Sequence, residues 1–291
     1  MRFALIATIL VVPALAVAAP KKAAKGAAGG GPPVGKTPPA CGVKVLPLVE
    51  GNSWTYTNVA APQPAEDAIK RIAPDPAKEI TITVKSVEAK KGADTVVTLE
   101  EKVTRDLTKD PKKPLLDERT IETTITCTDK KFVISPDSFF FAGEPGGYIG
   151  LKIDSLDHPK AANANSWILA KGGSGFGEQP WREEMTMHWT RVPSEGSEAK
   201  LGSGKLELER SFQPQPLDTV VTKLGTYSKT EKLALITTGR VTLDSPLAPQ
   251  DKPAELPANW LTTIWIAPNT GVVQTLNSYA HEYQLVSATL K

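Results

Sequence analysis

Histidine, cysteine and methionine are scarce in this chain of 291 residues, which has three, two and three of them. The histidines are too far apart to give a local metal-binding spacing: His158, His188 and His281. The chain also lacks a Cys-x-x-Cys pair and a Gly-x-Ser-x-Gly turn, the usual marks of a redox motif and of a serine nucleophile. We therefore expect no metal, no cofactor and no catalytic activity.

Excess charge of one sign is also missing. The formal net charge is +2 and the pI is about 8.4, so nothing favours binding to nucleic acid or to an anionic membrane. Proline, by contrast, is abundant, with 25 residues beside 22 glycines, which argues against long helices. A hydrophobic content of 40% is typical of a globular protein with a real core.

Only the N-terminus carries a long apolar run, "MRFALIATILVVPALAVA". Arg2 precedes an apolar stretch of signal-peptide length, and Ala16-Val17-Ala18 is a pattern that signal peptidases cleave. An uncleaved anchor is the alternative. We predict a signal peptide over residues 1–18, no membrane span after its removal, and export to the periplasm or the medium. The first cysteine, Cys41, comes too late for a lipid anchor.

The two cysteines, Cys41 and Cys127, would meet an oxidising compartment after export. A single intrachain pairing is open to them, and it would close a loop of about 87 residues. The alternative is a reactive thiol or a metal ligand, but no supporting spacing is present. The sequence favours a structural disulfide.

Residues 19–40 consist almost entirely of Ala, Gly, Pro and Lys, a composition typical of a disordered linker. Within them "GGPPVGKT", residues 30–37, matches the phosphate-binding loop pattern. That loop requires a strand before it and a helix after it, but Pro38 and Pro39 follow Thr37 directly, and a residue before proline disfavours helix. We therefore expect no nucleotide to bind.

From Cys41 onward the chain shows short runs of alternating apolar and polar residues, the pattern of half-buried strands. Examples are "EITITVKSV", "RTIETTITC", "KLELERSF" and "EYQLVSATL". One short helix is expected, over residues 65–73. We predict an all-β domain over residues 41–291 with about ten strands and at most one or two short helices. Its antiparallel sheet would be strongly curved, as a half-barrel or a sandwich.

The stretch "WREEMTMHW", residues 181–189, concentrates large polarisable side chains on one face of a strand. Four residues share that face with Glu183: Trp181, Met185, Met187 and Trp189. Such a face could line a cavity for a lipid or another apolar small molecule. It could equally be ordinary core, packed against a second layer.

Three separated motifs give the chain a resemblance to a known group. They are "LPLVEGNSWTYTN" (46–58), "TKLGTYSKTEKLALIT" (222–237) and "TIWIAPNTGVVQTLNS" (263–278). They resemble motifs of a loosely defined group of exported bacterial β-rich proteins, many of them lipoproteins, some similar to lipoprotein carriers in fold. The matching positions are Pro47, Leu48, Gly51, Trp54, Tyr56, Gly225, Thr226, Tyr227, Trp265, Ala267, Pro268, Gly271 and Val273. The resemblance implies an exported β-rich protein and no catalytic residue.

These observations leave three functional hypotheses. The first is a non-catalytic envelope protein that binds an apolar or lipid-like ligand on a concave sheet. The second is a structural or protein-interaction module of the envelope. The third is a secreted hydrolase whose site is assembled from distant loops, with His188 and Glu184 as titratable candidates.

Overall fold

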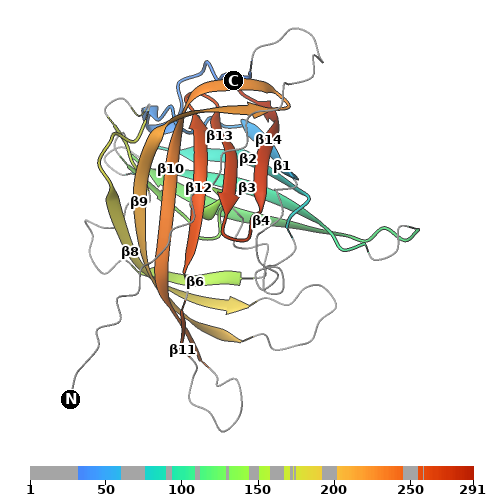
Figure 1. Ribbon diagram of the computed structural model, residues 1–291, viewed down its shortest axis with the longest axis vertical. Coiled ribbons are helices and arrows are strands. Elements are labelled where there is room, and N and C mark those ends of the chain that lie inside the picture. Colours follow the sequence, from blue (N-terminus) through green and yellow to red (C-terminus); the bar gives the residue numbers. More distant parts are fainter. Residues whose placement is uncertain are drawn as a thin grey trace, which may run out of the picture. The chain divides into compact units, whose positions relative to one another are not determined.

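The structure is a computed structural model that describes residues 32–59, 76–89, 94–108, 112–128, 131–143, 151–157, 167–170, 173, 175–191, 202–244, 255–257 and 259–291. The predicted signal peptide and the predicted helix over 65–73 lie outside these ranges. Gly31–Lys291 is one compact unit (Figure 1). Within the ranges above, no helix has the length and apolar character needed to cross a membrane.

The described chain is all-β, as the sequence predicts, and its fourteen strands pair antiparallel in one curved sheet. The sheet is a half-barrel rather than a sandwich, and its order is β6-β8-β9-β10-β12-β13-β14-β1-β2-β3-β4-β5-β7, with β11 beside β10. The strands are β1 (Ser53–Val59), β2 (Glu79–Glu88), β3 (Thr95–Asp106), β4 (Leu116–Cys127), β5 (Lys131–Ile134), β6 (Leu151–Asp157), β7 (Trp167–Ile168), β8 (Trp181–Arg191), β9 (Ser203–Thr222), β10 (Gly225–Leu243), β11 (Glu255–Pro257), β12 (Trp260–Ala267), β13 (Gly271–Asn277) and β14 (Glu282–Thr289).

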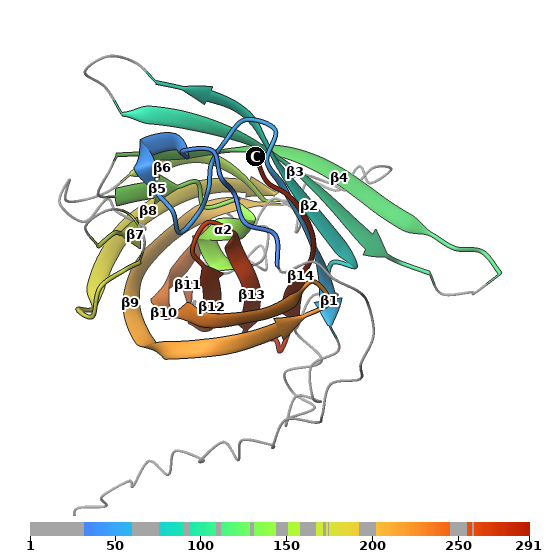
Figure 2. The same ribbon diagram turned by 90° about the horizontal axis from the view of Figure 1, so that it is seen from above.

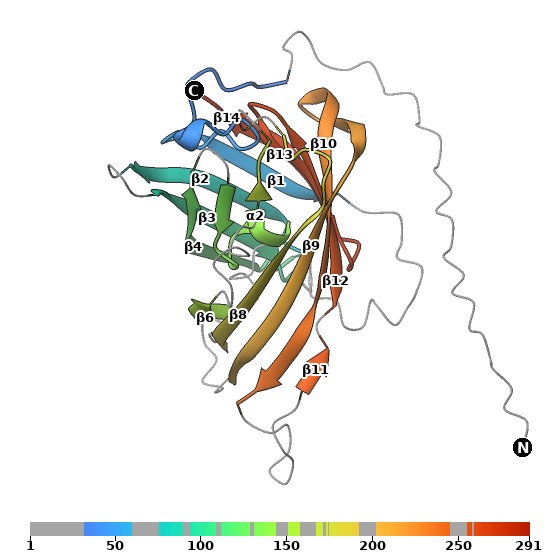
Figure 3. The ribbon, with the colours of Figure 1, turned by 90° about the vertical axis from the view of Figure 1, so that its left-hand side faces the viewer.

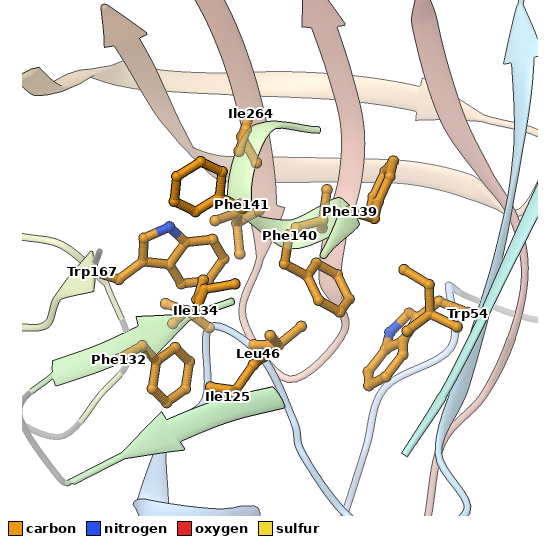
Figure 4. Close-up of a cluster of buried hydrophobic side chains, with 14 of the residues drawn as sticks. Leu46, Trp54, Ile125, Phe132, Ile134, Phe139, Phe140, Phe141, Trp167 and Ile264 are labelled. Carbon is orange, nitrogen blue, oxygen red and sulfur yellow. The ribbon is translucent and has the colours of Figure 1, made fainter. Parts of the chain in front are cut away.

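Two short helices complete the described elements, the 3-10 turn η1 (Ala40–Gly42) and α2 (Phe139–Ala142). Seen from above, the sheet curls around α2, which lies on its concave side (Figure 2). The apolar core fills the space between α2 and the inward side chains of the strands (Figure 4). Side chains of the strands that contact α2 therefore lie on the concave side of the sheet.

The long hairpin of β9 and β10 curves without losing its pairing over most of its length. Two glycines permit a close approach of the strands. A Cβ on Gly239 would collide with the carbonyl oxygen of Glu207, and one on Gly204 would lie 2.5 Å from that of Thr242. Glycine is the residue that allows a strongly bent sheet at such positions.

A chain of aromatic rings spans the two ends of the open sheet, from β5 and β7 to β8 and β9. Phe132 contacts Trp167 at 5.8 Å between ring centroids, and Trp167 contacts Phe176 at 5.4 Å. Phe176 lies 5.8 Å from Trp181, which stacks on Phe212 at 5.0 Å. Aromatic packing thus joins β5 and β7 to β8 and β9, which are not neighbours in the sheet. Trp181 is one of the rings that make this connection.

Residues 35–37, which belong to the predicted linker, make backbone hydrogen bonds to the C-terminal part of the chain. The backbone N–H of Gly35 donates to Asn269 O at 2.7 Å, and those of Lys36 and Thr37 donate to Lys291 O at 2.7 and 2.8 Å. These bonds need no apolar side chain, which is why composition does not reveal them. The "GGPPVGKT" lysine therefore belongs to a segment that pairs with the end of the chain.

The predicted disulfide is present between Cys41 in η1 and Cys127 at the end of β4, with the Cα atoms 6.1 Å apart. Cys127 is buried, which agrees with its inward position in the alternating strand. The bond fastens the N-terminal segment to the body across 86 positions of sequence. In the chain-entropy model a loop of that length contributes about 4–5 kcal/mol to stability.

Candidate ligand site on the concave face

The predicted Trp/Met face lies on the concave side of β8, and alternation along the strand is as expected. Met185 and Met187 are buried, with 2% and 4% of their surface exposed, whereas the two tryptophans are partly buried. On the neighbouring strand, Met185 pairs with Leu208 and Met187 with Leu206. The structure therefore brings three of the four candidates onto one apolar surface, which we call the methionine face: Met185, Met187, Trp189, Leu206 and Leu208. Trp181 is on the same side of β8, but the buried Glu183 separates it from Met185, and its ring stacks on Phe212.

Three consecutive phenylalanines that the sequence analysis did not single out form the centre of the concave side. Phe139, Phe140 and Phe141 in α2 are all buried (Figure 4). Phe139 lies 4.6 Å from the ring of Tyr56, and Phe140 meets Trp54 edge-on at 5.9 Å. Burying a phenylalanine contributes about 1.5–3 kcal/mol, so α2 stabilises the curved sheet that surrounds it.

A buried carboxylate holds the start of α2. Glu101 on β3 accepts hydrogen bonds from Ser138 Oγ at 2.6 Å, Phe139 N at 2.9 Å and Thr123 Oγ1 at 2.8 Å. Ser138 also caps the helix by accepting from Phe140 N at 3.2 Å. The free N–H of Phe139 is thus satisfied by a side chain from a strand 38 positions earlier, and that of Phe140 by the cap residue.

Burial has the largest effect on the pKa of the Glu101 carboxyl group. It raises the pKa of Glu101 to about 7, and the three hydrogen bonds from Ser138, Phe139 and Thr123 oppose the rise. The nearby charge of Asp137 adds to it. Glu101 therefore changes charge near neutral pH while it is hydrogen-bonded to the start of α2.

A buried arginine holds the other end of α2. Arg210 on β9 donates through Nη2 to the carbonyl oxygen of Phe141, and its guanidinium lies 3.7 Å from the centroid of that ring. Its Nη1 lies 3.5 Å from Glu183 Oε2 on β8, and both side chains are only 1% exposed. Burial lowers the pKa of Arg210 to about 10, and the charge of Glu183 partly offsets this effect.

The remaining candidates lie away from the methionine face. His188 is exposed on the convex side of β8. There Glu184, Glu207 and Arg240 contribute to the lining of a shallow depression of about 520 Å³. His281 is buried beside the rings of Tyr279 and Tyr283, at 5.8 and 6.5 Å, and His158 lies outside the described residues. Across the described ranges, no three His, Cys, Asp or Glu side chains gather to hold a metal.

The charged residues around α2 had a recognisable sequence signal. Glu101 interrupts the inward series Val97, Leu99, Val103, and Arg210 interrupts Leu206, Leu208, Phe212. Glu183 does the same among the large side chains of β8. A charged residue in an apolar register position needs a buried partner, so each interruption points to a polar contact on the concave side.

Comparisons with known proteins give two similar solved structures. No family model matches the chain, and no curated protein matches it. A Bacteroides fragilis protein, described as a candidate exported protein with a YmcC-like fold, is 15% identical with a TM-score of 0.44, over 84% of this chain and 98% of that one. A candidate lipoprotein from Parabacteroides distasonis is 14% identical with a TM-score of 0.49, over 85% and 99%.

Proposed function

We propose that this protein is an exported, non-catalytic protein of the cell envelope that holds an apolar, lipid-like chain against its methionine face. The observation that carries the proposal is the position of that face relative to α2. Arg210 marks the end of α2, and the inward residues Leu208 and Leu206 continue along β9 beyond it. Figure 3 shows β8, β9 and β10 running well past α2.

The chemistry of the methionine face supports a ligand of variable shape. Methionine is unbranched and polarisable, and it adapts to irregular apolar partners better than leucine or valine does. Both methionines of the face lie on one strand, opposite leucines on the next. An acyl chain on this face would contact the methionine side chains and the leucines opposite them.

Export is supported by the N-terminal sequence and by the disulfide. Residues 1–18 contain a basic residue, Arg2, followed by an apolar run and the small-x-small cleavage pattern Ala16-Val17-Ala18. The bond between Cys41 and Cys127 is of a kind that persists in oxidising compartments and is rare in the cytosol. Together they support a place in the periplasm or outside the cell.

The test is to isolate the processed protein from its native compartment and to look for a bound lipid. Native mass spectrometry followed by solvent extraction should reveal an apolar ligand at near-stoichiometric amounts. Met187→Trp should lower the amount recovered, because the larger side chain fills the methionine face. His188→Trp is the matched control, since it adds the same side chain one position away on the convex side.

Thermal midpoints should show that both variants are folded. Ligand-free protein that also fails to quench or enhance N-phenyl-1-naphthylamine would exclude the proposed binding. Equal loss of ligand in the Met187 and His188 variants would place the ligand elsewhere.

A second candidate function is a protein-interaction module, and one observation favours it. Ile236 on β10 and Leu261 on β12 are direct register partners, and they are 39% and 48% exposed on the convex side. Two large apolar side chains side by side in solvent are typical of a contact surface when they belong to a larger patch. Ile236→Lys with Leu261→Lys should abolish any association seen by cross-linking in the envelope and leave lipid recovery unchanged.

A further inference from the structure

A row of buried polar side chains crosses the concave side at the carbonyl end of α2. Glu183 pairs with Arg210, and Arg210 pairs with Thr237, as direct register partners on β8, β9 and β10. Thr262 on β12 is the register partner of Leu235, so it lies diagonal to Thr237. All of them are at most 1% exposed, and together with a threonine of β13 we call them the polar row: Glu183, Arg210, Thr237, Thr262 and Thr275.

Two members of the polar row, Arg210 and Thr275, bind the backbone of α2 and its cap. Arg210 donates to the carbonyl oxygen of Phe141, and Thr275 Oγ1 donates to that of Gly143 at 3.0 Å. Gly143 packs directly on the row, since a Cβ there would lie 2.8 Å from Thr275 Cβ and 3.2 Å from Thr262 Cγ2. Arg210 Nη2 and Thr275 Oγ1 are thus explained by the need to satisfy the carbonyl groups of α2 and its cap.

Three other polar atoms of the row have no such explanation. Arg210 Nε, Thr237 Oγ1 and Thr262 Oγ1 are buried, and no atom of the described chain is placed to hydrogen-bond them. A buried hydroxyl or N–H without a partner costs about 1–3 kcal/mol, and valine would fill the same space as threonine without that cost. Two adjacent strands that both carry threonine here therefore indicate a site built for a polar group.

The chemistry of the three atoms selects an oxygen acceptor. Arg210 Nε carries an N–H that can only donate, and each hydroxyl can donate as well. The charge of Arg210 is already paired with Glu183, which disfavours a doubly charged phosphate. One carboxylate or ester carbonyl oxygen matches the donors and adds little net charge.

The methionine face lies directly beside the Glu183–Arg210 pair of the polar row. Met185 follows Glu183 by two residues on β8, and Leu208 precedes Arg210 by two on β9, so both lie directly beside the row on the same face. A ligand with its polar end at the row would therefore extend its chain over Met185 and then over Met187. The polar oxygen of an acyl compound would then lie at the polar row, and its hydrocarbon chain would lie on apolar side chains.

We propose that Arg210 Nε, Thr237 and Thr262 form a subsite for the acyl oxygen of the ligand, either the carboxylate of a free fatty acid or the carbonyl of an acyl ester. This inference rests on the proposed function, because it assumes that the chain lies on the methionine face. It adds the chemical class of the ligand and the direction in which it lies.

The test measures displacement of N-phenyl-1-naphthylamine from the full processed protein by dodecanoic acid, methyl dodecanoate and dodecane. The two acyl compounds should bind at least tenfold more tightly than dodecane. Thr237→Val and Thr262→Val should each reduce that preference about threefold to tenfold, which is the effect of one hydrogen bond. Their thermal midpoints should stay equal or rise, because each change removes an unpaired buried hydroxyl.

Thr238→Val is the control, since Thr238 is exposed on the convex side of the same strand and should leave the preference unchanged. Equal binding of the acid and the ester would identify a carbonyl oxygen as the recognised group, and preference for the acid alone would identify a carboxylate. If all three compounds bind equally well, or if the valine variants keep the acyl preference, the three atoms hold only solvent and the subsite is refuted. If none of the compounds binds, the proposed function itself fails.

Discussion

The indole Nε1 of Trp54 donates a 2.6 Å hydrogen bond to the carbonyl oxygen of Thr270, 216 positions later in the chain. Two residues along the same strand, Tyr56 OH donates to Val272 O at 2.9 Å, also across 216 positions. Both rings are buried and also contact α2. The first and the last of the three motifs that suggest a resemblance to exported β-rich proteins are therefore in direct contact.

The Trp54 bond should be measurable as stability. Trp54→Phe leaves the buried carbonyl of Thr270 without this donor, and we expect a loss of about 1–3 kcal/mol in the free energy of unfolding. Trp181→Phe is a matched control, because the buried Nε1 of Trp181 has no hydrogen-bond partner in the described chain. Urea denaturation should show Trp54→Phe to be clearly the more destabilised variant, and equal losses would contradict the assigned role of the bond.

Glu101 should make stability depend on pH. Its pKa is raised in the folded state, to about 7, so its contribution is fully present below its unfolded pKa of about 4.5 and is lost as the pH rises through 7. Relative to Glu101→Gln, which cannot ionise, the wild-type protein should lose about 2.5 kcal/mol of unfolding free energy between pH 5 and pH 8.

Chemical denaturation at several pH values gives this difference directly. Glu100→Gln serves as the control, since Glu100 is the exposed neighbour on the same strand and should show a difference that varies little with pH. A flat difference between wild type and Glu101→Gln would mean that the carboxylate is not desolvated as the structure shows.

Arg210 and Glu183 should be strongly coupled. Arg210→Met removes the buried cation that lies 3.5 Å from Glu183 and a donor to Phe141, so we expect a loss of about 3–5 kcal/mol. Adding Glu183→Leu should recover part of that loss, because it removes the buried carboxylate with which Arg210 pairs. A double-mutant cycle measures the coupling, and additive losses would show that the two side chains act independently.

The disulfide should contribute a further, separable amount. Replacement of Cys41 and Cys127 together by serine should lower the unfolding free energy by about 4–5 kcal/mol, the loop-closure value for this separation. Alkylation of protein taken from the oxidising compartment should find no free thiol before reduction and two after it. Two reactive thiols without reduction would contradict the bond.

Much of the sheet could be predicted from alternation alone. In "RTIETTITC" the inward series ends at Cys127, and in "KLELERSF" it ends at Phe212, and both residues are buried in the structure. Alternation is a local property, because successive side chains of a strand point to opposite faces. The short strands β7 and β11 have two and three residues, too few for any period to be visible.

The placement of α2 could not be predicted in the same way. "FFFA" has no period, and its position depends on Glu101, 38 positions earlier, and on Arg210, 69 positions later. The sequence shows Glu101 and Arg210 each as a charged residue within an apolar series. It does not show which residues these charged side chains contact.

By itself, the sequence determined the class of the fold, the inward face of each long strand and the pairing of the only two cysteines, because these follow from local periodicity and from counting. Only the tertiary structure decided that Phe139–Phe141 fill the concave side, that Arg210 and Glu183 meet, and that Thr237 and Thr262 lie diagonally on adjacent strands. Those facts depend on strand register and sheet curvature, which set the distances between side chains that are far apart in the chain.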